Sequence, residues 1–464
     1  MEQTAARAGF SPEEPFNPNA PKRVVSVWDA IGLTVGIVIG AGIFRTPSLV
    51  ASNASGAGAV LLAWTLGGAV SLIGALVYSE LATTYPHAGG DYHYLTRAFG
   101  GRLAFLFAWA RMSVIQTGSI ALLAFVFGDY AAQVIPLGEY SSAIYAALIV
   151  VALTGLNILG VRQGTRTQNV LTGVEVFGVA SVIVAGLIVT AGPAAAPAVA
   201  SAPASSAFGL MMVFVLLTYG GWNEAAYVSA ELRDVRRNMT RALVVSILAV
   251  TALYILTNYA YLHALGFGGV ARADQVAAEV MRRAIGERGA QVISIFVAIS
   301  ALTSANASIF TGARTSYAFG CDFRTFGVLG RWSARTGTPV NALLLQGAVA
   351  LALVLLGTVT RRGFETIVDY TAPVFWFFFL LTGLSLFVLR RKEPGIARPF
   401  RAPLYPVTPI LFCLTSSYLL YSSLAYTRIG ALAGVAVVAL GALLSLLVIP
   451  LKSNTEQTSR RQTP

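Results

Sequence analysis

The feature that most constrains the fold of this chain is a series of long apolar stretches. A membrane-spanning helix needs about 20 predominantly apolar residues, and we identify twelve stretches of roughly that length. They are too long and too apolar for strands of an outer-membrane barrel, in which apolar and polar residues alternate over about ten residues. The predicted spans are Val24–Leu49, Ala57–Leu81, Leu103–Tyr130, Ser141–Leu159, Gln168–Ala191, Phe208–Ala230, Ala242–Leu265, Gln291–Phe319, Val340–Val359, Thr366–Leu389, Val407–Tyr426 and Ile429–Leu451. The sequence therefore predicts an all-α integral membrane protein with twelve transmembrane helices.

Charge and composition support this interpretation. Charged residues make up 11% of the chain, whereas soluble domains contain about a quarter, so membrane lipid is the expected surroundings. The net charge of +12 does not indicate nucleic-acid binding, because most of the 32 Lys and Arg residues lie in segments on one predicted side of the membrane. That asymmetry is typical of cytoplasmic segments. We therefore expect a multi-pass protein of a bacterial-type inner membrane, with cytoplasmic tails at residues 1–23 and 452–464.

Glycine clusters interrupt two of the predicted spans near their middles. The first span contains Gly40-Ala41-Gly42, and the sixth contains Tyr219-Gly220-Gly221-Trp222. Glycine costs up to about 1 kcal/mol in a helix interior, so such a cluster marks either a close packing face or a break that lines a cavity. The two clusters occupy corresponding places in residues 24–191 and 207–391. This favours an inverted repeat of five plus five helices, with spans one and six broken and a binding site at the midplane, followed by two helices in residues 407–451.

The chemistry of such breaks suits an amino acid. Freed N–H groups at a helix N-terminus carry a partial positive charge of about half an electron, and freed carbonyl groups carry the opposite charge. A carboxylate and an ammonium group can therefore be held by backbone alone. No charged side chain, costly at this depth, is needed.

Local motifs that belong together lie within the segments Gly36–Phe44, Ser79–Gly100, Val114–Ala121, Tyr219–Asn238 and Arg398–Pro406. They resemble motifs of the amino acid–polyamine–organocation superfamily, in the branch of L-type amino acid transporters and bacterial Ser/Thr exchangers. The resemblance implies alternating access, with sodium-independent exchange or proton symport of amino acids. It also implies that substrate carboxylate meets N–H groups near Ala41, Gly42 and Ile43, and that the ammonium group meets carbonyl groups in both breaks. The candidate substrate-binding residues are Val38, Ile39, Gly40, Ala41, Gly42, Ile43, Leu217, Thr218, Tyr219, Gly220, Gly221 and Trp222.

The sequence departs from the family pattern at three positions. Ala41 stands where many relatives have Ser, and Leu217 stands where many have an aromatic gate. The smaller side chain of Leu217 would widen the pocket or shift gating to Tyr219 or Trp222; the alternative is a neutral replacement in the core. Glu175 stands where relatives of the sodium-independent branch commonly have a lysine facing the first break.

The role expected for Glu175 is proton coupling, because an ionised acid in mid-span costs on the order of 3 kcal/mol and burial favours its protonated form. A bound cation near it is the second choice. The alternatives are a helix shifted by one turn, a side chain that reaches the interface, and a static pair with Arg111. Arg111 itself either forms a static pair or lines the substrate path. Thr303 and Ser304 form a candidate sodium site, although hydroxyl groups in membrane helices more often bond to backbone.

The function predicted from these features is transport of neutral L-amino acids, with no cofactor. The chain is not expected to be an enzyme, because its three histidines form no ligand-spaced or nucleophile–base arrangement. It contains no phosphate-binding loop, so ATP-driven transport is not expected either. The alternatives are a transporter of cationic amino acids or polyamines, and a membrane sensor of amino acids. Animal relatives attach to a partner through a cysteine after helix three, but Gln133–Glu139 contains none, so no covalent heavy-chain partner is expected.

Overall fold

The computed structural model describes residues 25–447, apart from 88, 160–164, 190–204, 230–231, 334, 337 and 427–428. The predicted tails lie outside these residues. The described part is built from helices, joined by short connections. They are α1 (Val27–Ile39), α2 (Gly42–Ser52), α3 (Ala57–Thr84), α4 (Asp91–Phe99), α5 (Gly101–Ala110), η1 (Arg111–Ile115), α6 (Gln116–Val134), α7 (Ser141–Ile158), α8 (Thr165–Ile188), α9 (Ser205–Thr218), η2 (Trp222–Val228), α10 (Val235–Arg272), α11 (Val276–Ile285), α12 (Glu287–Asp322), η3 (Arg324–Phe326), α13 (Val340–Val359), α14 (Gly363–Lys392), α15 (Val407–Tyr426) and α16 (Ile429–Leu447).

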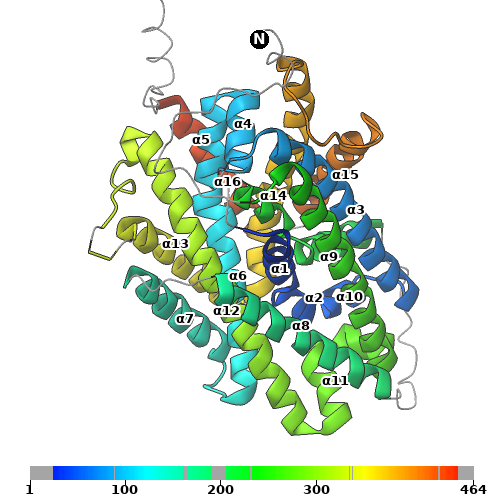
Figure 1. The fold of residues 1–464 in the computed structure, drawn as a ribbon. Coiled ribbons are helices and arrows are strands. Elements are labelled where there is room, and N and C mark those ends of the chain that lie inside the picture. The colour runs from blue at the N-terminus through cyan, green and yellow to red at the C-terminus, as the bar shows by residue number, and fades with distance from the viewer. Residues whose placement is uncertain are drawn as a thin grey trace, which may run out of the picture.

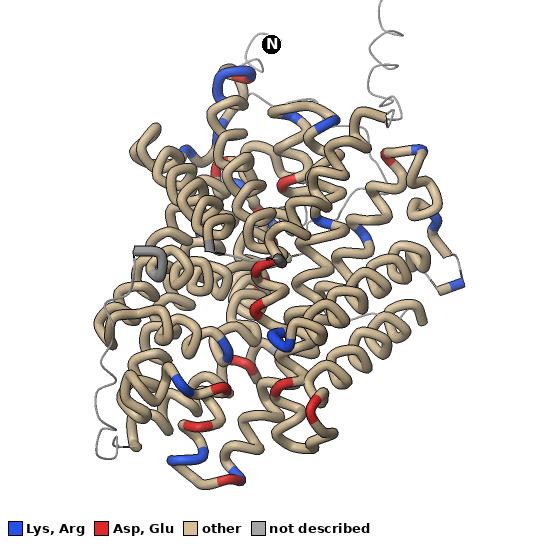
Figure 2. Tube along the Cα trace, turned by 180° about the vertical axis from the view of Figure 1, so that it is seen from behind, with Lys and Arg blue, Asp and Glu red and all other residues tan. Residues whose placement is uncertain are grey.

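Among the described residues, nine helices are long and apolar enough to cross a membrane. The number rises to ten if the bent pair α1 and α2 forms one span. Figure 2 shows Lys, Arg, Asp and Glu gathered mainly toward the two ends of the molecule, with a largely uncharged middle. The all-helical, multi-pass class is therefore confirmed, whereas the count of twelve spans stays a prediction. The predicted fifth span falls on α8, whose first residues are only partly described, and the sixth is split between α9 and η2.

Helices α1 and α2 lie at the centre of the bundle (Figure 1). Around them, α3 packs along α10 and α6 packs along α12. Small residues allow this close approach: a Cβ atom on Gly68 of α3 would lie 2.4 Å from the Thr251 side chain of α10. Likewise, a Cβ atom on Gly312 of α12 would lie 2.4 Å from Cγ of Gln116. These contacts join the second predicted span to the seventh and the third to the eighth.

A buried carboxylate ties α3 to α14 and to the segment that follows it. Glu80 is 1% exposed, and its Oε1 accepts a hydrogen bond of 2.7 Å from Nε of Arg390. Its Oε2 accepts one of 2.7 Å from the backbone N–H of Ala402, and Nε of Arg398 lies 3.5 Å from Oε1. Glu80 is therefore buried inside a shell of hydrogen-bond donors and positive charges.

Replacing Glu80 with glutamine should destabilise the protein. Removing one partner of a buried ion pair costs about 3–5 kcal/mol, because the remaining charge stays buried without compensation. We expect a clearly lower melting temperature of Glu80→Gln in detergent. The matched control is Glu287→Gln, since Glu287 is exposed and its ion pair with Arg282 lies at the surface. Equal melting temperatures of the two variants would contradict a structural role of the buried pair.

Candidate substrate site at two helix breaks

The first predicted interruption is present in the structure. Helix α1 ends at Ile39, and α2 begins at Gly42 with its axis turned by 46°. Gly40 caps α1 with φ −27° and ψ −175°, which takes the chain out of the helix. The first N–H groups of α2 have no partners within their own helix, as at every helix start. They therefore lie where a carboxylate was predicted to bind.

The second predicted interruption follows α9. This helix ends at Thr218, and the chain turns through Tyr219, Gly220 and Gly221. It then continues as the 3₁₀ helix η2, not as a regular α-helix. Gly221 has a φ of 103°, a conformation that glycine adopts at no steric cost.

The two breaks pack directly against each other. The Thr46 and Thr218 hydroxyl groups lie 2.7 Å apart and join α2 to α9. A Cβ atom on Gly42 would lie 3.1 Å from the Thr218 side chain, and one on Gly221 would lie 2.6 Å from the Ile37 side chain. The glycines therefore allow two backbone segments, distant in the sequence, to form one surface.

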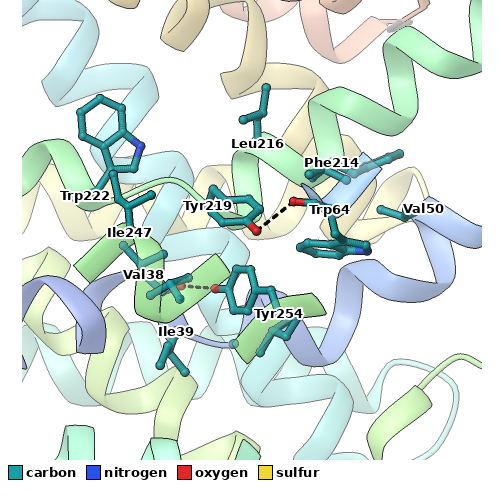
Figure 3. Close-up of a cluster of buried hydrophobic side chains, with 14 of the residues drawn as sticks. Val38, Ile39, Val50, Trp64, Phe214, Leu216, Tyr219, Trp222, Ile247 and Tyr254 are labelled. Carbon is teal, nitrogen blue, oxygen red and sulfur yellow. Dashed lines mark hydrogen bonds between the residues drawn. The ribbon is translucent and has the colours of Figure 1, made fainter. Parts of the chain in front are cut away.

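Tyr254 of α10 bridges the carbonyl groups of the two breaks. Its hydroxyl group donates a hydrogen bond of 2.6 Å to the Val38 carbonyl and also reaches the Thr218 carbonyl at 3.2 Å. Figure 3 shows the Tyr254 hydroxyl group pointing at Val38. Both carbonyl groups belong to the predicted ammonium site. Tyr254 could not be predicted from the sequence, because no local motif marks which face of α10 meets the breaks.

A cavity of about 240 Å³ lies between the breaks. That volume is below the range of about 300–1,000 Å³ for drug-sized ligands, so the cavity suits a small molecule. Among the candidate substrate-binding residues, those on its wall are Val38, Gly40, Ala41, Gly42, Leu217, Thr218, Gly220 and Gly221. The surface of the wall as a whole is mostly apolar, but the remaining wall residues also include polar side chains, among them Gln116, Asn223 and Thr371.

Four candidate residues point elsewhere. Ile39, Ile43, Tyr219 and Trp222 are buried but do not line the cavity. The Tyr219 hydroxyl group donates to the carbonyl group of Trp64 at 2.9 Å, away from the cavity wall (Figure 3). Tyr219 therefore links the second break to α3 and does not contribute to the cavity wall.

Glu175 lies buried between α8 and α12, next to the first break. Its Oε1 accepts a hydrogen bond of 2.8 Å from the Ser300 hydroxyl group. Within the described residues, its Oε2 has no hydrogen-bond partner. One turn earlier, Thr172 packs against Gly36 of α1. Glu175 makes no ion pair with Arg111, which excludes the static pair between these two residues in this structure.

The candidate sodium residues point in different directions. The Thr303 hydroxyl group donates to the carbonyl group of Ile299 in its own helix, at 2.9 Å. Ser304 lines the cavity opposite Gly40. The structure therefore gives Thr303 the backbone bond that is common in membrane helices and leaves Ser304 at the cavity.

Arg111 forms an ion pair with Glu224 on the cavity wall. Both carboxylate oxygens of Glu224 lie 3.1 Å from Nη2 of Arg111. Arg111 begins η1, a π-helical segment between α5 and α6. Such segments often occur at functional sites. The sequence could indicate this ion pair only in part: an arginine within a predicted span needs an acidic partner, but nothing local identifies Glu224 as that partner.

Arg45 forms a second charged cluster, next to the cavity residue Phe364. From α2 it lies 3.3 Å from Glu365 of α14 and 3.8 Å from Asp129 of α6. It also donates to the carbonyl group of Asp274 at 2.7 Å, and its guanidinium group lies 5.7 Å from the ring centre of Phe364, a cavity residue. Arg45 is not among the site residues predicted from the sequence. Its position three residues after Gly42 could have indicated a charged group near the site.

Gly221→Ala should disrupt the site. A side chain at this φ costs on the order of 1–3 kcal/mol, and its Cβ atom would collide with Ile37. We expect a loss of substrate affinity of about tenfold or more, since tenfold corresponds to about 1.4 kcal/mol, measured by binding to the purified protein. The control Gly155→Ala, on α7, places its Cβ atom in open space. Unchanged affinity in Gly221→Ala would show that this turn does not shape the site.

Comparison with known proteins agrees with the predicted family. Residues 25–444 match the amino acid permease family. The b(0,+)-type amino acid transporter 1 of Rattus norvegicus is 31% identical over 437 residues, which cover 90% of this chain and 87% of the relative. The large neutral amino acids transporter small subunit 2 of Mus musculus is 31% identical over 418 residues, which cover 87% of this chain and 77% of the relative. These relatives are transporters, not enzymes, and the chain belongs to the amino acid permease family of the amino acid–polyamine–organocation superfamily.

Proposed function

We propose that this permease transports neutral L-amino acids by alternating access, as an exchanger or as a proton symporter. The observation that carries the proposal is the cavity between the two helix breaks, which combines backbone groups with apolar side chains. The N-terminus of α2 would hold the substrate carboxylate, and carbonyl groups of both breaks would hold the ammonium group. Leu122, Leu217 and Phe375 on the wall would then contact an uncharged side chain.

The names of the relatives support amino acids as the substrates of this chain. One is named for large neutral amino acids, and the other is named a b(0,+)-type amino acid transporter. The small cavity and its mostly apolar lining favour the neutral class for this chain over polyamines, which would need several carboxylates along their length.

We also propose that Glu175 couples transport to protons. Its hydrogen-bond donor Ser300 lies one turn before Ser304 of α12, and Ser304 lies opposite Gly40 in the first break. A change of charge at Glu175 would therefore be felt where the ammonium group is proposed to bind. An ionised carboxylate with a single described hydrogen bond is costly at this depth, so protonation and release would favour different states of the transporter.

Our proposal for the cellular setting follows the charge distribution. We place the chain in a bacterial-type inner membrane with both termini in the cytoplasm. We propose that it acts without a disulfide-linked partner, although one relative is named a small subunit. The two cysteines of the chain, Cys321 and Cys413, lie in α12 and α15, and the segment Gln133–Glu139 contains none.

Counterflow tests the proposed activity. Proteoliposomes that contain the full chain and an internal neutral amino acid should accumulate the labelled form from outside, without ATP. Competition by excess neutral amino acids, lysine and putrescine then ranks the substrate classes. An absence of accumulation for every amino acid would reject transport and favour a sensor. Competition by putrescine alone would favour a polyamine transporter.

Glu175→Gln tests proton coupling. The amide cannot exchange a proton, so uptake should become equal at acidic and neutral pH, while counterflow at neutral pH continues. The measurement is initial uptake rate across a pH series in proteoliposomes. Glu139→Gln is the matched control, because Glu139 is exposed and distant from the breaks. If Glu175→Gln kept the pH dependence of the wild-type protein, proton coupling through Glu175 would be rejected.

A further inference from the structure

We propose that the Arg111–Glu224 ion pair is the charge filter of the cavity, which keeps its wall neutral and so excludes substrates with a cationic side chain. This inference rests on the proposed transport of amino acids and names the residues that set its charge selectivity. Arg111 acts here as a positioning and neutralising residue, whereas Glu224 is the side chain that a substrate would meet.

The two members of the pair are exposed very differently. The Glu224 side chain is 27% exposed and the Arg111 side chain is 4% exposed. Glu224 is the only charged side chain among the described residues that line the cavity, and Arg111 is not on the wall. The carboxylate therefore faces the space for substrate, and its counter-charge lies behind it.

Several contacts hold Arg111 in this position. Its Nη1 donates to the Tyr227 hydroxyl group at 3.0 Å, and its guanidinium group lies 4.5 Å from the centre of the Tyr227 ring. Oδ2 of Asp91 accepts from the same tyrosine hydroxyl group at 3.3 Å. The arginine is thus fixed from the side opposite the cavity and cannot easily swing into it.

The location of the charges determines the effect on substrates. A carboxylate on the wall of a protein cavity attracts a cation more strongly than one in bulk water does, because the effective dielectric constant there is lower. Arg111 cancels that attraction at short range. A substrate with a lysine-like side chain would lose its hydration without gaining a net electrostatic attraction, because Arg111 offsets the charge of Glu224. A neutral side chain does not need such an attraction. Substrate charge is therefore selected by a residue that the substrate never touches.

The test compares Arg111→Gln, Glu224→Gln and the double variant by uptake of labelled leucine and lysine into proteoliposomes. Arg111→Gln should raise the lysine-to-leucine ratio by about tenfold or more, which corresponds to about 1.4 kcal/mol. Glu224→Gln should not raise it. The double variant should return the ratio to the wild-type value, because its wall is neutral again, and neutral replacement of a buried ion pair is usually tolerated.

The control is Arg361→Gln, which removes one cation from an exposed pair with Glu139 and should leave the ratio unchanged. If Arg111→Gln cannot be purified, Asn223→Asp adds an unpaired carboxylate to the same wall and should raise the ratio instead. An unchanged ratio in a folded Arg111→Gln, or in its substitute, overturns the inference. So does a double variant that folds but keeps the lysine preference. A wild-type protein that transports no amino acid would instead reject the proposed function.

Discussion

Backbone groups freed inside a membrane must find partners without the help of water, and the centre of this structure is organised around that requirement. The chain leaves the helical conformation twice, after Ile39 and after Thr218. A tyrosine hydroxyl group from α10 then contacts one carbonyl group from each break. Glycines bring the two segments within van der Waals distance, so that one side chain can serve both. The site therefore exists because two helices stop at the same place, and it remains ordered because α10 supplies the missing donor.

Buried charges follow the same requirement, but they are compensated to different degrees. Glu80 is surrounded by guanidinium groups and a backbone N–H group, which suits a structural role. The Arg111–Glu224 pair is complete but opens onto the cavity on one side. Glu175 has one described donor for two oxygens. The ionised form of a carboxylate is stabilised where donors surround it and is costly where one of its oxygens is buried without a donor.

The features that could be predicted from the sequence are those encoded within one segment. Apolar length predicts helices, and glycine clusters predict the breaks, because both depend on neighbouring residues in the chain. The family resemblance was confirmed for the same reason, since its motifs are local strings. The partners of Arg111 and Arg45 could not be predicted, because each depends on which faces of distant helices meet. The sequence also gave no sign that the second break would continue as a 3₁₀ helix.

The geometry at Tyr254 bears on how the two halves of the site could move. One hydroxyl proton is shared between two carbonyl groups, and the bond to Val38, at 2.6 Å, is shorter than the contact with Thr218, at 3.2 Å. If α1 moves relative to α9 during alternating access, the hydroxyl group would keep the stronger partner and follow α1. The Thr218 carbonyl group would then lose its donor inside a membrane, at a cost of about 1–3 kcal/mol. An ammonium group in the cavity could replace that donor, so substrate binding and helix movement would stabilise each other at this single carbonyl group.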